Sequence, residues 1–391
     1  MSQKTLKHVF SILTIISVLV GFGLAAVYFL NPVGALERGP RYVIFLWVCA
    51  VIGVVSSMAM GFFWVKVAKG WRVAKLYLLA IIALLIIGLS GFLYASYVDH
   101  QQYHTLTVNG VERQYLIFIP TTYSPSQPVP LLLVLHGGSG NAKQFQDQTG
   151  FNQIAQQEGF IVVYPDGLGT FKYSLHVWNS GYIKAASDMG TDDVGFLTTL
   201  IENLEQTYSI DTLRIYLTGH SNGGMMTDRM AAEHPELFAA VAPVSSSIGG
   251  KATPQSPPYT IPTPSQPVTV IRTHGLQDQN VLYNGGYSQS GFQVGERYDD
   301  SENQSTTFWI NNNKCQNSPA ITNSTNGLIT MERFTGGQNA TEVVLVTING
   351  ENHFWENMNR AVQSEQFNGG SLSEMIWNLL KEYAKMQPAR T

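Results

Sequence analysis

Cysteine is scarce in this chain, which contains two in 391 residues. Cys49 lies in an apolar segment near the start, and Cys315 stands alone in the second half of the chain. No disulfide can therefore form within the second half, which excludes a small scaffold held together by such bonds. Nothing in the segment Asn311–Cys315 would lower the pKa of a thiol, so we interpret Cys315 as structural rather than nucleophilic. Paired thiolates of a zinc site are also lacking, and we expect no metal and no cofactor.

Charged side chains are equally sparse, at 13% of the residues against 45% hydrophobic ones. The net charge of −4 divides into +7 over residues 1–98 and −11 over residues 99–391. An acidic domain of this kind repels phosphate backbones and other anionic polymers. We therefore exclude nucleic acid as a partner.

The apolar excess is concentrated near the start, in segments Val9–Leu30, Tyr42–Val65 and Leu76–Val98. Each is about 22 to 24 residues long without a charged side chain, enough for a helix to cross a hydrocarbon core of roughly 30 Å. A cleaved signal peptide would be shorter than the first segment and would not explain the other two. We predict three transmembrane α-helices in a membrane region over 1–98, followed by a domain over 99–391.

Basic residues in the connecting loops predict the orientation of these helices. Lys4 and Lys7 precede the first segment, and four basic residues separate the second from the third, whereas two separate the first from the second. Positive charge collects on the cytoplasmic side of a membrane. We therefore expect a multi-pass protein of the cell membrane with a cytoplasmic N-terminus and an extracytoplasmic domain over 99–391.

From Tyr103 onward, apolar runs typical of strands alternate with helical patterns. The predicted strands are His104–Val108, Arg113–Ile119, Leu131–Leu135, Phe160–Tyr164, Leu213–Leu217, Ala239–Val244, Val268–Thr273 and Val343–Ile348. The predicted helices are Phe151–Glu158, Val194–Tyr208, Met225–His234 and Leu372–Met386. This alternation predicts an α/β fold with a doubly wound, mostly parallel sheet. Asn109–Gly110 adds the signal of a type I′ hairpin at its start.

The segment Gly219-His220-Ser221-Asn222-Gly223 has the pattern Gly-x-Ser-x-Gly between a predicted strand and a predicted helix. This is the context of a nucleophile elbow, the sharp turn that holds the catalytic serine of an α/β-hydrolase above its sheet. We predict that Ser221 is the nucleophile and that the backbone N–H of Asn222 faces developing negative charge. The alternative is a glycine-rich turn that only caps a helix.

A second glycine-rich turn, His136–Gly140, follows directly after the first central strand. An α/β-hydrolase places the other half of its oxyanion hole there. We predict backbone donors at Gly137 or Gly138, opposite that of Asn222, and a structural role for His136 through a side-chain hydrogen bond. An ordinary turn from a strand to a helix is the alternative.

A serine nucleophile needs a base, and the base needs an acid that fixes its tautomer. In an α/β-hydrolase the acid and then the histidine follow the serine in the chain, each after a later strand. Asp278 follows the strand that ends at Thr273, and His353 follows the strand that ends at Ile348. We therefore predict that Ser221, Asp278 and His353 form a catalytic triad.

Other polar residues fit these roles less well. His234 lies at a helix end, His274 comes directly after its strand, and Asp299 and Asp300 lie in a polar stretch without a preceding strand. We predict that Asp193 caps the helix that follows it, because aspartate is favoured at this position.

Several spaced motifs carry a family resemblance: Val162–Gly167, Trp178–Asn179, Asp192–Leu197, Gly219–Met226 and Phe238–Val244. Together they resemble the polyhydroxybutyrate depolymerase-like esterases, a family that also includes feruloyl and acetylxylan esterases. The resemblance implies an enzyme that acts on carboxylic ester bonds and supports the same triad by position. It also implies that Trp178 lines the pocket for the acyl or alcohol group.

Three functions are compatible with these patterns. The first is a membrane-anchored serine carboxylesterase that works through an acyl-serine intermediate. The second is a serine peptidase, because a triad also cleaves amides and this fold hosts both activities. The third is a non-catalytic sensor or adhesion domain. We favour the first, with a small-molecule or oligomeric ester as substrate and the lipid bilayer as the partner of the N-terminal helices.

Two stretches rich in small and polar residues, Ser245–Pro267 and Asn284–Glu302, interrupt the alternation of strands and helices. The first lies between two strands, where a lid over the site can arise. Either stretch can equally be a surface loop.

Overall fold

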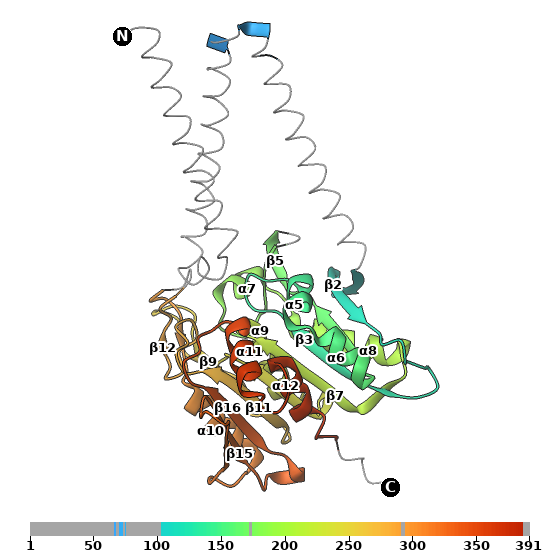
Figure 1. Cartoon of the computed structure of the whole chain (residues 1–391), viewed down its shortest axis with the longest axis vertical. Helices are drawn as coiled ribbons and strands as arrows, with labels where there is room; N and C mark the ends of the chain where they lie inside the picture. The colour runs from blue at the N-terminus through green and yellow to red at the C-terminus, as the bar shows by residue number, and fades with distance from the viewer. Residues whose placement is uncertain are drawn as a thin grey trace. The chain divides into compact units, whose positions relative to one another are not determined.

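The structure is a computed structural model that describes residues 66–67, 70–72, 75, 103–171, 174–290 and 294–385 (Figure 1). The three predicted transmembrane helices lie outside these residues and stay a prediction. Across the described ranges, no helix combines the length and apolar character needed to span a bilayer. The chain divides into two compact units, and the larger comprises Gln102–Gln289 and Gly295–Thr391.

The larger unit is built on a ten-stranded sheet in the order β1-β2-β4-β3-β7-β8-β11-β16-β15-β14. Its parallel centre consists of β4 (Ile161–Pro165), β3 (Val129–Leu135), β7 (Ile210–His220), β8 (Ala240–Val244), β11 (Thr269–Gly275) and β16 (Val343–Ile348). Antiparallel hairpins form the edges, β1 (His104–Val108) with β2 (Val111–Phe118) and β14 (Ala320–Asn323) with β15 (Ile329–Phe334). The predicted α/β fold with a mostly parallel sheet is thus confirmed.

Helices cover both faces of this sheet (Figure 1). One layer contains α5 (Ala142–Thr149), α6 (Phe151–Glu158), α11 (Trp355–Glu365) and α12 (Leu372–Leu380). The other contains α8 (Asp193–Thr207), α9 (Asn222–Glu233) and α10 (Glu302–Asn313). In β3, Leu132 and Val134 pack in the first layer, whereas Leu131, Leu133 and Leu135 pack in the second. The apolar run of β3 therefore serves two cores, as the alternating side chains of a central strand require.

The hairpin at the start of the sheet has the predicted turn. Asn109 and Gly110 both have positive φ, at 51° and 78°, and Val108 pairs with Val111 across them. A type I′ turn requires positive φ at both central residues, and asparagine followed by glycine supplies it at little steric cost.

The start of α8 corrects one prediction. Asp192, not Asp193, caps this helix, because its side chain accepts a hydrogen bond from the backbone N–H of Gly195 at 2.9 Å. Asp193 lies inside the first turn, is buried and forms an ion pair with Arg113 at 2.6 Å. The prediction for Asp193 is therefore wrong by one residue.

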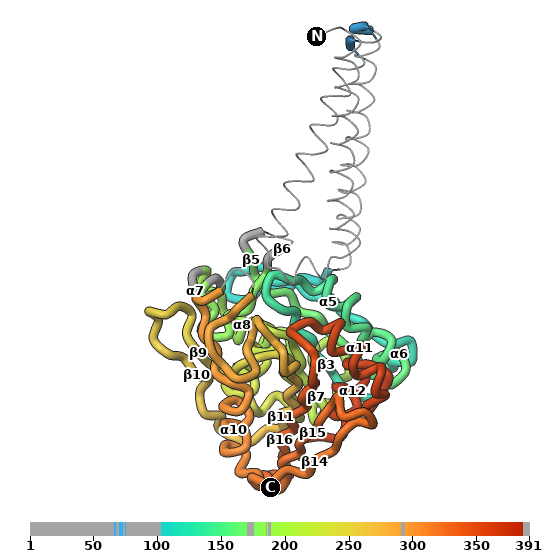
Figure 2. The backbone as a smooth tube through the Cα atoms, turned by 60° about the vertical axis from the view of Figure 1, so that its left-hand side comes forward, coloured from blue at the N-terminus to red at the C-terminus, as the bar shows by residue number. Residues whose placement is uncertain are grey.

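The two stretches that interrupt the alternation combine into one small sheet. Its order is β10-β9-β13-β12, with β9 (Gly249–Lys251) and β10 (Tyr259–Thr260) from the first stretch and β12 (Gly286–Tyr287) and β13 (Tyr298–Asp299) from the second. Figure 2 shows β9 and β10 side by side. The stretches are therefore not independent surface loops, because β9 and β13 share backbone hydrogen bonds.

Candidate active site

Ser221 lies at the junction of β7 and α9, with φ of 55° and ψ of −121°. A left-handed backbone at a residue other than glycine costs about 1–3 kcal/mol and persists only where the surroundings enforce it. Here the backbone N–H of Ser221 donates to the carbonyl oxygen of Val244 at 2.8 Å. The strained turn at Ser221 is that of a nucleophile elbow.

The two glycines of the motif are required by close packing. A Cβ atom on Gly219 would lie 2.4 Å from the carbonyl oxygen of Gly223, and one on Gly223 would lie 2.4 Å from the carbonyl oxygen of His136. Both contacts are with backbone atoms, which cannot swing aside as a side-chain end can. The elbow thus packs directly against the loop that begins at His136.

The structure brings the three predicted triad side chains together. Nε2 of His353 lies 2.8 Å from Oγ of Ser221, and Nδ1 of His353 lies 2.6 Å from Oδ2 of Asp278. These residues follow β7, β11 and β16, whose carboxyl ends lie at the same edge of the parallel sheet. The arrangement is the hydrogen-bond chain of a nucleophile, a base and an orienting acid.

Two backbone donors hold the other oxygen of the acid. Oδ1 of Asp278 accepts hydrogen bonds from the N–H groups of Asn280 at 2.7 Å and Val281 at 2.9 Å. Burial alone would raise the pKa of Asp278, but the charge of His353 and hydrogen bonds from His274 and His353 hold it well below its usual range. An ionised Asp278 keeps the proton of His353 on Nδ1, which leaves Nε2 free to accept the serine proton.

His220, inside the Gly-x-Ser-x-Gly motif, fixes the backbone of the base. Its Nε2 lies 2.7 Å from the carbonyl oxygen of His353, and because a carbonyl oxygen only accepts, Nε2 carries the proton. Burial, followed by the charge of His353, lowers the pKa of His220 to about 3, so the ring is neutral. The local sequence does not reveal this role of His220, because its partner lies 133 residues away in the chain.

The two predicted halves of the oxyanion hole lie beside the nucleophile. A Cβ atom on Gly138 would lie 3.5 Å from Cβ of Asn222, and one on Gly137 would lie 3.5 Å from Cβ of Ser221. The N–H of Asn222 belongs to the first turn of α9, where backbone donors have no acceptor within the helix. These donors can therefore face a substrate oxygen, in the role that we propose for them below.

Trp178 connects the two halves. Its indole Nε1 donates to the carbonyl oxygen of His136 at 2.9 Å, and its backbone N–H donates to Oδ1 of Asn222 at 2.7 Å. Its carbonyl oxygen accepts from Nδ2 of Asn222 at 3.0 Å. The side chain is fully buried. A lining role in the substrate pocket stays a prediction, and the contacts observed are those of a support between the elbow and the loop.

A buried cluster of His136, Asp166 and His176 packs against the loop that begins at His136. Nδ1 of His136 lies 2.8 Å from the carbonyl oxygen of Gly137 and donates to it, while Nε2 accepts from the N–H of Gly167 at 3.0 Å. Nδ1 of His176 lies 2.7 Å from Oδ1 of Asp166. The structural role predicted for His136 is thus confirmed. Ligand atoms of these three residues lie within 4.8 Å of one another, yet the hydrogen bonds of His136 account for its position without a metal ion.

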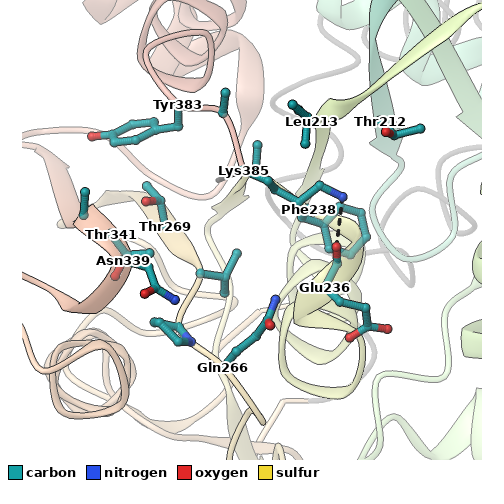
Figure 3. Close-up of a pocket in the computed structure, with 15 residues that line it drawn as sticks. Thr212, Leu213, Glu236, Phe238, Gln266, Thr269, Asn339, Thr341, Tyr383 and Lys385 are labelled. Atoms are coloured by element: carbon teal, nitrogen blue, oxygen red, sulfur yellow. Dashed lines mark hydrogen bonds between the residues drawn. The ribbon is translucent and has the colours of Figure 1, made fainter. Parts of the chain in front are cut away.

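The structure contains a cavity of about 540 Å³ (Figure 3). Thr212 and Leu213 near the start of β7 and Thr269 at the start of β11 line it, so it opens at the amino ends of the strands. Nζ of Lys385 donates there to the carbonyl oxygens of Glu236 and Leu237 at 2.9 and 3.0 Å. The triad belongs to the opposite edge of the sheet.

Comparison with known proteins identifies the relatives of this domain. Residues 114–259 match the family described as Esterase PHB depolymerase, which confirms the predicted resemblance. The bifunctional acetylxylan esterase/xylanase XynS20E of Neocallimastix patriciarum is 31% identical over 175 residues, which are 44% of this chain and 22% of that protein. Feruloyl esterase B of Piromyces equi is 28% identical over 248 residues, which are 62% of this chain and 42% of that protein.

The chain thus spans less than half the length of these curated relatives. Among solved structures, an acetyl xylan esterase from Aspergillus awamori aligns with a TM-score of 0.46 and 16% identity, over 64% of this chain and 93% of that one.

Proposed function

We propose, on the premise that residues 114–259 carry an Esterase PHB depolymerase domain, that the chain is a serine hydrolase of carboxylic esters. The observation that carries this proposal is the hydrogen-bond chain from Ser221 through His353 to Asp278. The names of the relatives, acetylxylan esterase and feruloyl esterase, favour an ester over an amide as the substrate.

In the proposed reaction, Oγ of Ser221 attacks the carbonyl carbon of the ester while Nε2 of His353 takes the hydroxyl proton. The negative charge that develops on the carbonyl oxygen is stabilised by the backbone N–H of Asn222 and by one from Gly137 or Gly138. One such donor is typically worth about 3–4 kcal/mol in the transition state.

The tetrahedral intermediate then collapses into an acyl-serine. The bond to the alcohol oxygen breaks, and His353 returns its proton to that oxygen as the alcohol leaves. A water molecule attacks the acyl carbon in the same way, with His353 as base, and the acid product leaves Ser221 with its proton restored. No further reactant is needed.

Substrate preference provides the test. The full-length chain is compared on short-chain acyl esters, a feruloyl ester, acetylated xylan, a hydroxybutyrate oligomer and peptide amides. We expect the highest kcat/KM for short soluble esters, because Ser221 is only 7% exposed and a slender acyl group reaches it most easily. Faster turnover of amides than of esters would indicate the peptidase, and no turnover of any substrate by folded protein would indicate a non-catalytic domain.

We also propose that the N-terminal region anchors the domain to the cell membrane on its outer side. The support is the sequence pattern: three long apolar segments with basic residues gathered on one side of them. In intact spheroplasts, added protease should digest the region 103–391 and leave a cytosolic marker whole. Protection of this region while the membrane is sealed would contradict the orientation.

A further inference from the structure

His274 is a second histidine in contact with the acid of the triad. It lies in β11 and is fully buried. Its Nδ1 lies 2.7 Å from Oε2 of Glu302, and its Nε2 lies 2.9 Å from the carbonyl oxygen of Val281 and 3.2 Å from Oδ2 of Asp278. Every one of these partner atoms is an acceptor. Both ring nitrogens must therefore donate, and a histidine that donates from both nitrogens is a cation.

The alternative, a protonated Glu302 that donates to a neutral ring, is disfavoured by the other contacts of this carboxylate. The Nε atom of Arg272 donates to Oε1 of Glu302, and so does the hydroxyl of Thr306 at 3.0 Å. Arg272 in turn donates to Oδ1 of Asp228 at 2.7 Å. A carboxylate with this many donors is held in its ionised form.

These residues form a buried row in which the sign of the charge alternates. It runs from Asp228 through Arg272, Glu302 and His274 to Asp278, and all five side chains are buried. Each of the three inner charges, those of Arg272, Glu302 and His274, lies between opposite charges, which offsets the cost of removing it from water. The row ends at the acid of the proposed triad.

We propose that His274 is a positively charged positioning residue of the active site, which holds the carboxylate of Asp278 in place and in its ionised form. The inference rests on the proposed hydrolase function. His274 touches no reacting atom and acts through Asp278.

His274 acts on the site through a shared oxygen. Oδ2 of Asp278 accepts from Nδ1 of His353 at 2.6 Å and faces Nε2 of His274 at 3.2 Å. The cation therefore holds, in position and in its ionised form, the same carboxylate that orients the ring of His353.

The remaining groups that face His274 agree with its positive charge. Tyr283 packs edge-on at 5.5 Å between ring centroids, and burial raises its pKa to about 12, so it adds no charge near neutral pH. His220 is neutral because burial lowers its pKa to about 3. Burial alone would lower the pKa of His274, but the hydrogen bonds and charges of Asp278 and Glu302 raise it to about 10.

The first test is the pH profile of kcat/KM for the full-length chain with His274→Gln. Loss of the cation should move the acid limb of the profile upward by roughly one pH unit, because the pKa of Asp278, which His274 lowers, then rises. The matched control is His234→Gln, a partly exposed histidine paired with Glu236 at 3.0 Å, whose profile should match the wild type. An unchanged acid limb with a uniform loss of rate would reduce His274 to a packing role and overturn the proposal.

The second test does not depend on activity or on the folding of a variant. Nitrogen-15 resonances of the histidine rings are recorded on the wild-type chain labelled at histidine. We expect one buried ring with protons on both nitrogens from pH 6 to about 9, in accord with a buried imidazolium. An assignment in which one nitrogen of His274 lacks a proton at pH 7 would refute the proposal. A wild type without ester turnover would instead refute the proposed function, while the resonances still decide the charge.

Discussion

Replacement of Ser221 by alanine is expected to lower kcat for ester hydrolysis by about 10,000-fold to a millionfold, the range found when the nucleophile of a triad is removed. The loss is large because Ser221→Ala removes the atom that would form the proposed acyl intermediate, while Gly138 and Asn222 keep the proposed oxyanion donors. The measurement is the initial rate on a short soluble ester, together with labelling by a fluorophosphonate. The variant should take up no label.

Two checks separate this result from a loss of fold. Thermal unfolding of Ser221→Ala should occur close to the wild-type temperature, because alanine removes only the hydroxyl and keeps the Cβ atom at this buried position. The control Ser126→Ala removes an exposed hydroxyl that bonds to Ser124 at 2.9 Å, and it should keep both the rate and the label. Labelling that persists in Ser221→Ala would place the nucleophile elsewhere.

Replacement of Asp278 by asparagine is expected to lower kcat by about 10,000-fold, through the tautomer of His353. The N–H groups of Asn280 and Val281 face Oδ1 of residue 278, so an asparagine must keep its oxygen on that side. Its amide NH₂ then faces Nδ1 of His353. Because the NH₂ group only donates, Nδ1 must accept and cannot carry a proton. The proton of His353 therefore moves to Nε2, where it points at Ser221. Nε2 can then no longer accept the serine proton.

Comparison of pH-rate profiles measures this effect. Asp278→Asn should stay slow at neutral pH with a folded structure, and the half-buried Asp300→Asn should retain a rate close to that of the wild type. A loss of less than about tenfold in Asp278→Asn would mean that another group orients His353, contrary to the triad.

The parallel sheet and the chain order of Ser221, Asp278 and His353 were predictable because their signals are local. A run such as Leu131–Leu135 is typical of a buried strand, and Gly-x-Ser-x-Gly marks a turn within five residues. The ends of adjacent parallel strands then meet at one edge. The proximity of the three residues thus follows from the order of the strands and could be predicted without knowledge of distant contacts.

The edge hairpin of β14 and β15 was not predicted, because its local sequence signal is weak. All four residues of β14 are exposed, so the alternation of apolar and polar residues that marks a half-buried strand is missing. Helix α10 was missed because its sequence contains Glu302, Gln304 and a run of asparagines and has no clear apolar stripe. Its capping box, Ser301 with Gln304, was the available signal.

Residues that act through tertiary contacts were the hardest to recognise. His274 was set aside as a base because the predicted strand ended at Thr273, although β11 continues to Gly275. The local sequence says nothing about the contact with Glu302, 28 residues away. Trp178 was assigned to the pocket by resemblance, yet its hydrogen bonds with His136 and Asn222 span 42 and 44 residues. Such partners are set by the packing of elements and leave no mark in the local sequence.

The small sheet of β9, β10, β12 and β13 limits how this domain can acquire a new specificity by recombination. Arg297, beside β13, donates to the carbonyl oxygen of Asn280 at 2.8 Å, two residues from Asp278. If Ser245–Pro267 alone were replaced by the corresponding segment of another protein, β13 would lose its pairing with β9. Backbone N–H and C=O groups of β13, next to Arg297, would then be left unpaired. We therefore expect that the two stretches must be exchanged together, because β13 joins the first stretch to the segment that contacts Asn280, two residues from Asp278.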